Sequence, residues 1–241
     1  MFKFMLLSAL VWVKELPSTQ DELKRGGYPS GTVLVADRQT AGRGRRGRRW
    51  LSDEGGLYFS FLLRPELFPE LLPLPVVLGL AVCRLLENEG LRPSLKWPND
   101  VYLSGRKLCG ILTEVSKSGL VVGVGLNVNQ TSFPEGLNAT SLKLETGRTL
   151  DRKELLLKLL KSFSEELGRF RQEGFKGLRK EAVDRLLWLG EEVKLSDGRT
   201  GKLAGLSERG GLLLLTERGL EEVLSGELTL RLNARREDAS L

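Results

Sequence analysis

The pattern of apolar residues and turn residues changes at Gly190, and this change constrains the fold more than any other feature of the sequence. Before Gly190, short apolar runs alternate with longer segments that have helical periodicity. After it, short strand-like runs follow one another through Asp-Gly and Gly-Gly turns. The first pattern is typical of a mixed α+β domain and the second of a small β-barrel. Both are expected here, because 241 residues are enough for the two.

Periodicity and turn residues place the expected elements. Strands are expected at residues 11–16, 32–36, 57–63, 95–97, 101–103, 108–115 and 120–128, and after Gly190 at 192–195, 200–206, 211–216, 220–223 and 228–232. Helices are expected at residues 20–24, 74–89, 152–173 and 176–187. Residues 40–49 and 129–139 are polar and rich in turn formers, so they are expected to be loops. The charged tail after Asn233 is expected to be disordered.

Composition excludes several kinds of active site. The chain has no histidine, which removes Ser-His-Asp and Cys-His nucleophiles and histidine-ligated metals. Cys83 and Cys109 lie in apolar runs and are expected to be buried free thiols, which suits a reducing compartment such as the cytoplasm. The apolar residues 1–13 carry no signal-peptide cleavage site, and no stretch is long enough to cross a membrane, so no membrane contact is expected. The net charge of +6 favours anionic partners without choosing among them.

Residues 40–50, which follow Gln39 and which we call the arginine loop, form the first candidate site. Their sequence is Thr-Ala-Gly-Arg-Gly-Arg-Arg-Gly-Arg-Arg-Trp. The glycines let backbone N–H groups approach an anion, and the arginines supply forked donors for carboxylate and phosphate. An exposed Trp50 can stack on a base. Composition alone leaves a second interpretation open, a disordered basic segment that binds RNA.

Two further segments combine lysines with turn residues. In residues 96–100, Lys-Trp-Pro-Asn-Asp, a lysine ends a strand and a turn presents an amide and a carboxylate, which suits a phosphate beside Mg²⁺. In residues 106–114, Arg-Lys-Leu-Cys-Gly-Ile-Leu-Thr-Glu, Lys107 precedes a strand and Gly110 indicates a close approach to its backbone. A solvated strand end and an ordinary hairpin with a surface lysine are the plain structural alternatives.

The fourth segment, residues 122–129, reads Val-Gly-Val-Gly-Leu-Asn-Val-Asn. Two glycines in an apolar strand again indicate that something lies close to the backbone. Asn127 is polar among apolar neighbours, so it needs partners, either a ligand or the backbone around it. The residues alone do not choose between the two.

The order and spacing of these segments resemble the biotin–protein ligase family. Ser18-Thr19-Gln20 precedes the arginine loop, and the three segments just described follow in the family's order. Residues 133–135, Phe-Pro-Glu, and 139–142, Ala-Thr-Ser-Leu, also look like that family, and the resemblance covers about residues 11–232. Because the chain begins close to the first of these motifs, it looks like the monofunctional class without an N-terminal DNA-binding domain. DNA is therefore not an expected partner.

This resemblance implies a fold and an activity. Family members have a mixed catalytic domain related to class II aminoacyl-tRNA synthetases and an SH3-like C-terminal domain, here expected at residues 1–188 and 189–233, with 234–241 as a disordered tail. They join the carboxylate of biotin to the α-phosphate of MgATP, giving biotinyl-5′-AMP and pyrophosphate. They then transfer biotin to one lysine of the biotin carboxyl carrier protein of acetyl-CoA carboxylase. Biotin, ATP and Mg²⁺ are thus expected as substrates, with no tightly bound prosthetic group, and a homodimer is one option for assembly.

The resemblance also implies roles for individual residues. The catalytic residues would be Lys107, Arg43 and Lys96. Biotin would be bound by Ser18, Thr19, Gln39, Gly42, Arg43, Lys107 and Gly110. ATP or the adenylate would be bound by Arg43, Arg45, Arg46, Arg48, Trp50, Lys96, Asn99 and Asn127. Asp100 would orient Mg²⁺.

Two alternatives stay open. A lipoate–protein ligase shares the family's fold, although the arginine loop and Lys-Trp-Pro-Asn-Asp fit the biotin branch better. A non-enzymatic RNA-binding protein would use the arginine loop and would need neither Lys96, Lys107 nor Asn127. Its binding would weaken steeply with salt.

Overall fold

One mixed sheet of seven strands organises the computed structural model, which describes residues 7–230. Along the sheet the strands follow the order β1-β2-β3-β7-β6-β5-β4. Their bounds are β1 (Ala9–Leu16), β2 (Thr32–Gln39), β3 (Leu57–Leu63), β4 (Pro93–Lys96), β5 (Asp100–Leu103), β6 (Arg106–Ser116) and β7 (Gly119–Leu126). β1 and β2 run parallel and are joined by helix α1 (Thr19–Arg25), as a parallel pair requires a crossover. The other neighbours in the sheet pair antiparallel.

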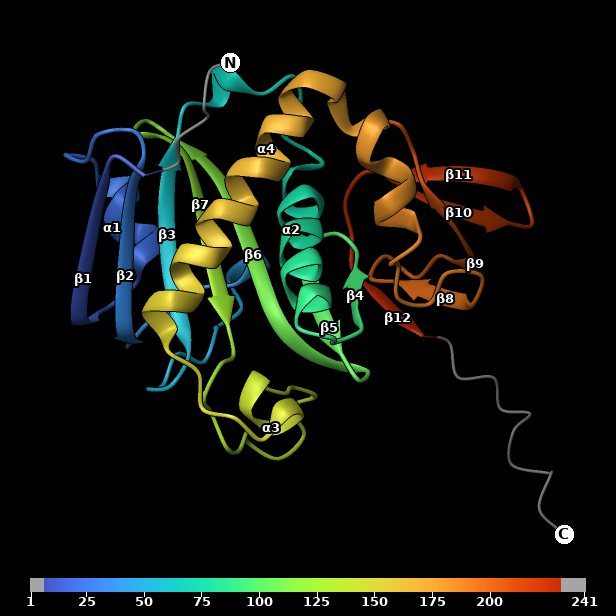
Figure 1. Cartoon of the computed structure of the whole chain (residues 1–241). Helices are drawn as coiled ribbons and strands as arrows, with labels where there is room; N and C mark the ends of the chain where they lie inside the picture. The colour runs from blue at the N-terminus through green and yellow to red at the C-terminus, as the bar shows by residue number, and fades with distance from the viewer. Residues whose placement is uncertain (1–6, 231–241) are drawn as a thin grey trace, which may run out of the picture.

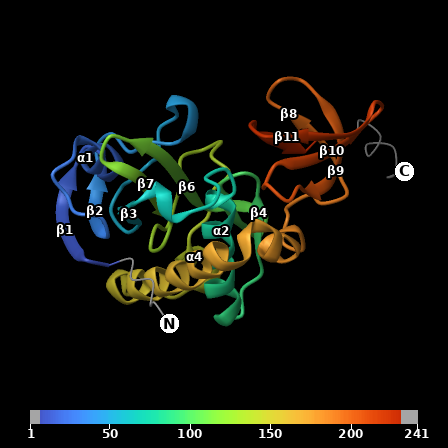
Figure 2. The same cartoon turned by 90° about the horizontal axis from the view of Figure 1, so that it is seen from above.

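The two faces of this sheet are covered differently. Helices α2 (Leu74–Asn88) and α4 (Arg152–Val183) lie on one face and α1 on the other, as Figures 1 and 2 show. Successive side chains of a strand point to opposite faces. In β2, for example, Val33 and Val35 join the large core under α2 and α4, whereas Leu34 joins a small core with Leu23 of α1. The α1 face therefore has room for a site.

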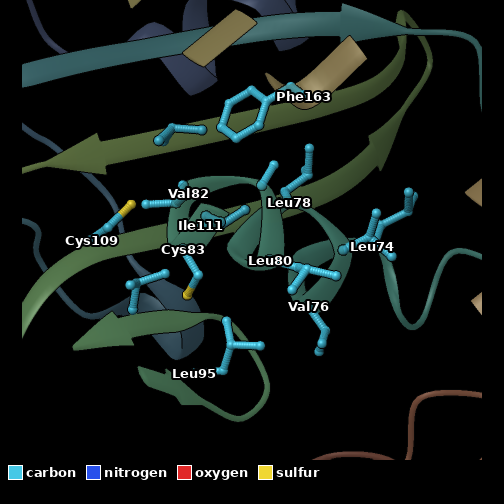
Figure 3. Packing of buried hydrophobic residues seen from close by; sticks show 14 of the residues in the cluster. Leu74, Val76, Leu78, Leu80, Val82, Cys83, Leu95, Cys109, Ile111 and Phe163 are labelled. Atoms are coloured by element: carbon cyan, nitrogen blue, oxygen red, sulfur yellow. The ribbon is translucent and has the colours of Figure 1, made fainter. Parts of the chain in front are cut away.

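The large core fixes the strands that carry the candidate segments. Figure 3 shows side chains of α2 packed beside Ile111 of β6 and Leu95 of β4. Phe163 of α4 is fully buried, and its ring centroid lies 5.8 Å from that of Phe61 in β3. Cys109 is buried in this core, as expected of a free thiol. These contacts leave β6 and β7 little freedom to shift.

A second, antiparallel sheet lies beyond the β4 edge of the first (Figure 1). Its strands are β8 (Glu192–Leu195), β9 (Thr200–Leu206), β10 (Leu212–Thr216), β11 (Gly219–Val223) and β12 (Leu228–Leu230), in the order β11-β10-β9-β8-β12. The connection from α4 pairs with β4, because the N–H of Leu187 donates to the carbonyl of Leu95 at 2.8 Å. Trp97 donates from Nε1 to the carbonyl of Gly210 at 3.0 Å. The second sheet is thus fixed beside the end of β4, where Lys96 lies.

The expected α+β architecture with a small β unit at its end is confirmed, with differences at the ends of elements. The two helices expected at residues 152–187 form α4, which breaks at Gly174, where φ is 65°, and ends at Val183. It ends there because the next residues pair with β4. The short helix α3 (Leu142–Thr146), capped by Ser141, was not expected. The tail after Asn233 lies outside the described residues, and within them no helix is long and apolar enough to cross a membrane.

Candidate active site

A cavity of about 350 Å³ opens on the α1 face of the main sheet. Its floor consists of small residues: Ser60 of β3, Gly123 and Gly125 of β7, and Gly110 of β6. Gly125 is the register partner of Gly110, and Gly123 that of Ser60. The valines that alternate with these glycines in β7 point into the large core. On the cavity face, β7 therefore has no side chain at Gly123 and Gly125. The hollow has the size of a small ligand site.

Trp50 lies over this floor. A Cβ atom added to Gly110 would lie 2.6 Å from Cζ3 of the indole, and one added to Gly125 would lie 2.5 Å from its Nε1. The expected close approach to both glycines is therefore confirmed, and the approaching group is Trp50 of the protein itself. The expectation that Trp50 is exposed is wrong, because the ring is half-buried where it covers the bare strands and so removes apolar area from water. Its Nε1 is buried and has no hydrogen-bond partner within residues 7–230, so this donor is available to a ligand.

One end of the cavity is a chain of polar side chains. Gln39 accepts from the backbone N–H of Thr19 at 2.8 Å and lies 3.1 Å from its hydroxyl. The Thr19 and Ser60 hydroxyl oxygens are 2.8 Å apart, and Ser60 lies 3.3 Å from Oε1 of Gln20. All four residues line the cavity, and Ser18 joins them while its hydroxyl caps α1 by accepting from the N–H of Asp21.

This polar end has more acceptors than protons. Gln20 donates both of its amide protons elsewhere, to Glu114 and to the carbonyl of Val121, so its oxygen faces Ser60. The three oxygen contacts that run from Gln39 through Thr19 and Ser60 to Gln20 can share only the two hydroxyl protons. One contact is therefore always without a proton. Gln39 Oε1 already accepts from the Thr19 N–H, so no oxygen is orphaned, but a lone pair at that contact stays open to a further donor. A ligand that brings N–H groups to this end would supply what is missing.

The other end is cationic. Lys107, at the start of β6, places Nζ 2.8 Å from Oδ2 of Asp100, and its Nζ lies 5.0 Å from the centroid of the Trp50 ring. Oδ1 of Asp100 is buried and has no partner in the described part of the chain. The end therefore combines a lysine in contact with the cavity and an acceptor that is open to a cation.

Lys96 lies at the same end in an aromatic environment. Its Nζ is 5.2 Å from the ring centroid of Tyr102 and 5.1 Å from that of Trp188, and it donates to the Tyr102 hydroxyl at 3.2 Å. Burial lowers the pKa of Lys96, and the neighbouring charge of Asp100 opposes that shift. Partial desolvation makes such an ammonium a stronger partner for a phosphate than an ammonium in open water.

The arginine loop is folded over the cavity and is tied to the second sheet. Arg45 donates to Oδ1 of Asn99 at 3.1 Å and to the carbonyl of Gly226 at 3.3 Å. Arg46 donates to the Ser196 hydroxyl at 3.0 Å, and Arg48 forms an ion pair with Glu227. The alternative of a disordered basic segment is thus wrong for this loop. Ser196, Gly226 and Glu227 come from turns more than a hundred residues away, which sequence patterns did not connect to the loop.

Arg43 is held differently from the other arginines. Its guanidinium pairs with Asp21 of α1 and lies 3.4 Å from both carboxylate oxygens of Glu114 in β6. Gly44 donates to the carbonyl of Arg48 and Trp50 to that of Gly42, so the loop closes as a small hairpin around Arg43. Side-chain contacts therefore hold the base of the loop to α1 and β6.

The remaining expected residues fall into two groups. Asn99 donates to the carbonyl of Ile111 at 3.1 Å, and Asn127 donates to the carbonyl of Thr140 at 2.9 Å; both line the cavity. Gly42 and Arg46 lie outside the cavity wall formed by the described residues. Gly42 packs against Ser52 and Trp50, and the Arg46 side chain is exposed.

Several residues of the site were not predicted from the sequence. Ser60 and Tyr102 line the cavity, whereas the sequence placed them only within expected strands. Residues 137–139 also line it, because Lys107 pairs through its backbone with this loop. Period-two counting along β3 could have placed Ser60, since it faces the same side as the glycines of β7.

Substituting Gly125 with alanine is expected to destabilise the protein by about 1–3 kcal/mol, because the new methyl group would overpack against the indole of Trp50. Gly168→Ala is the matched control. Its Cβ meets nothing within 4 Å, and alanine favours a helix interior over glycine, so the same change there should stabilise by about 0.5–1 kcal/mol. Urea unfolding measures both. Equal effects of the two substitutions would show that Trp50 does not press on β7.

Comparison with known proteins agrees with this geometry. Residues 12–130 match the model of the biotin/lipoate A/B protein ligase family. The bifunctional ligase/repressor BirA of Bacillus subtilis is 34% identical over 92% of this chain and 74% of its own length. The biotin–[acetyl-CoA-carboxylase] ligase of Paracoccus denitrificans is 31% identical over 84% of this chain and 91% of its own. Among solved structures, the biotin protein ligase of Aquifex aeolicus in complex with biotin and ATP superposes with a TM-score of 0.88 and 54% identity, covering 93% of this chain and 99% of that one.

Proposed function

This chain belongs to the biotin–protein ligases, and we propose that its cavity joins biotin to AMP and then passes biotin to a lysine of a carrier protein. The observation that carries this proposal is the opposition of the two ends of the cavity. One end presents oxygen acceptors with an open lone pair and the other offers lysines, across a floor of glycines and one serine. Biotin has the matching form, with a ring that carries N–H groups at one end and a carboxylate at the other.

The polar end is assigned to the ureido ring of biotin. Its N–H groups can supply the proton that the contacts from Gln39 through Thr19 to Gln20 lack. Ser18 lies beside them on the cavity wall, and the backbone at Gly110 borders the same space. The apolar part of biotin then faces Trp50 and the glycine floor, where burial is favourable.

The cationic end is assigned to the reacting groups. A carboxylate and a triphosphate repel one another, so the first step needs positive charge at the point where they meet. Lys107 is proposed to contact both, with Lys96 supporting the phosphates. The Arg43 guanidinium is held by Asp21 and Glu114, at the other end of β6, so Arg43 is proposed to hold the activated acid through the backbone of the loop. Arg45 and Arg48, both on the cavity wall, are proposed to hold ATP or pyrophosphate, together with Arg46 if the loop tightens. Trp50, Asn99 and Asn127 are proposed to contact the nucleotide.

The reaction then proceeds in two balanced steps. A carboxylate oxygen of biotin forms a bond to the α-phosphorus of ATP while the bond from that phosphorus to the β-bridging oxygen breaks and pyrophosphate leaves. The amine of the carrier lysine next attacks the carboxyl carbon of the mixed anhydride. The bond from carbon to the phosphate oxygen breaks, AMP leaves, and the amine loses its proton to solvent or to a nearby base. Positioning and charge, rather than a protein nucleophile, perform the chemistry.

Mg²⁺ enters as part of the ATP complex, and the residues present fit that arrangement. Within residues 7–230 no group of three carboxylate or thiolate ligands could hold a metal by itself. Asp100 offers the buried oxygen without a partner, and Mg²⁺ is commonly held by one or two carboxylates together with substrate phosphates. Asp100 would therefore hold the ion, which neutralises phosphate charge.

The acceptor is proposed to be the biotin carboxyl carrier protein of acetyl-CoA carboxylase. The name of the Paracoccus relative supports this proposal, because it gives acetyl-CoA carboxylase as the substrate of that enzyme. We place the reaction in the cytoplasm, which suits the buried free thiols Cys83 and Cys109. Residues 1–188 are proposed as the catalytic domain and 189–233 as the SH3-like domain. A homodimer remains one option for its assembly.

The decisive experiment measures exchange of labelled pyrophosphate into ATP without any acceptor protein. Biotin should stimulate the exchange strongly, and lipoate at the same concentration should not. Stimulation by lipoate alone would place the chain in the other branch of the family. No stimulation by either acid would contradict the proposed function.

A further inference from the structure

Glu114 occupies a position that the proposed reaction does not use directly. It lies near the end of β6, behind the cavity wall formed by the described residues, with a quarter of its side chain exposed. It receives hydrogen bonds from Gln20 at 3.0 Å and Lys24 at 3.1 Å, and the Arg43 guanidinium lies 3.4 Å from both of its oxygens. Burial alone would raise the pKa of Glu114, but these hydrogen bonds and the charge of Arg43 outweigh it and lower the pKa. The side chain is therefore a carboxylate at neutral pH.

In one direction Glu114 fixes the polar end of the cavity. The Gln20 amide group donates to Glu114 and to the Val121 carbonyl, which leaves its oxygen no orientation except toward Ser60. From Ser60 the contacts continue through Thr19 to Gln39. Gln39 donates onward to the Ser52 hydroxyl at 2.9 Å, two residues after the arginine loop ends.

In the other direction Glu114 fixes the base of the arginine loop. Arg43 stands between two glycines whose backbone bonds close the loop hairpin, and Trp50 is held by one of those bonds. The side-chain contacts that join the base of this hairpin to α1 and β6 are those of Arg43 with Asp21 and Glu114. One carboxylate thus contacts both the group that orients the biotin end and the group that anchors the loop.

We propose that Glu114 is a positioning residue that couples biotin binding to the closure of the arginine loop over ATP. The inference rests on the function proposed above. A ligand that reorganises the hydrogen bonds of Gln20 changes how Glu114 shares its oxygens with Arg43. An anion that draws on Arg43 changes in turn how firmly Gln20 is held. Such coupling is reciprocal between the two ligands.

The test measures the dissociation constant of biotin by calorimetry, with and without a saturating ATP analogue that has a methylene group between its α- and β-phosphorus atoms. The ratio of the two constants is the coupling factor. For the wild-type chain we expect roughly tenfold or more, and for Glu114→Gln less than about threefold. Lys24→Met removes a partner of Glu114 that contacts neither ligand end, so its factor should stay at the wild-type value.

The outcomes separate this inference from the proposed function. If the wild-type chain binds no biotin, the proposed function fails and Glu114 has nothing to couple. If it binds biotin and Glu114→Gln keeps the wild-type factor, or Lys24→Met loses it equally, the coupling role of Glu114 is wrong. Should Glu114→Gln fail to fold, Glu114→Asp takes its place, because it keeps the charge but shortens the side chain that reaches both Gln20 and Arg43. An unchanged factor in that variant would also overturn the inference.

Discussion

Lys107→Ala should lower the rate of biotin adenylate formation by a factor of about a hundred to a thousand while leaving the fold intact. The loss corresponds to about 3–4 kcal/mol of transition-state stabilisation, the usual cost of removing one group that faces developing charge. Truncation should spare the fold, because the backbone of Lys107 is held on both sides by residues 138 and 140 and its side chain has no core role. Biotin-dependent exchange of pyrophosphate into ATP measures the rate directly.

Arg106→Ala is the matched control for this prediction. Arg106 precedes Lys107, and its half-exposed side chain pairs with Glu145, away from the cavity wall of the described residues. Glu145 keeps its hydrogen bonds from Ser104 and Thr140 when Arg106 is truncated, so the exchange rate of this variant should stay close to wild type. The thermal midpoints of both variants should be similar. Near-normal exchange in Lys107→Ala would mean that this lysine serves only to neutralise Asp100, its partner in the structure.

Periodicity predicted the main sheet well because the strands are packed on both faces. β3 was placed at residues 57–63, the bounds that the structure has, since every residue of that run is buried. Short strands before turns were also found, because Asp-Gly and Ser-Gly pairs leave few other conformations. The ends of helices and strands were predicted less accurately where they depend on residues distant in the sequence. Residues 184–187 were expected to continue the helix but instead connect to β4, where Leu186 pairs with Leu95. The sequence of residues 184–187 does not indicate this pairing.

The candidate site was predicted as a set of segments but not as a geometry. The glycines of β6 and β7 correctly indicated a close approach, yet their sequence could not say that Trp50 is the approaching group. Glu114 is the last residue of the candidate segment 106–114, but its three partners come from α1 and from the arginine loop, so only the fold brings them together. The same reason hid Glu227 and Ser196, which meet the loop across the two sheets. Local pattern identifies residue types, and long-range packing decides which of them meet.

A second large effect is expected from substituting Arg45, which contacts residues beside both sheets. Arg45 is half-buried, and burial lowers its pKa, but the guanidinium stays charged and donates to Asn99 beside the cationic end and to Gly226 in the turn before β12. Hydrogen bonds from a charged group are worth about 1.5–3 kcal/mol each, so losing even one should shift loop opening by about tenfold. The remaining charges at Lys107 and Lys96 would still support adenylate formation.

Arg45→Gly should therefore make the adenylate and fail to retain it. Biotinyl-AMP is a reactive anhydride that the closed loop shields from water and from stray amines, so its escape would biotinylate lysines of unrelated proteins. The assay incubates the variant with biotin, ATP and a bystander protein and measures attached biotin, which should exceed the wild-type level on the order of tenfold, following the shift in loop opening.

Arg209→Gly serves as the control, because this exposed arginine pairs with Glu222 in the second sheet and touches neither the arginine loop nor the cavity wall of the described chain. Pyrophosphate release from biotin and ATP must be measured in parallel, since a variant that makes no adenylate cannot leak it. Adenylate synthesis without bystander labelling above wild type would show that the loop stays closed without Arg45. The links of Arg46 to Ser196 and of Arg48 to Glu227 would then be the contacts that hold it, because they tie the same loop to the same sheet.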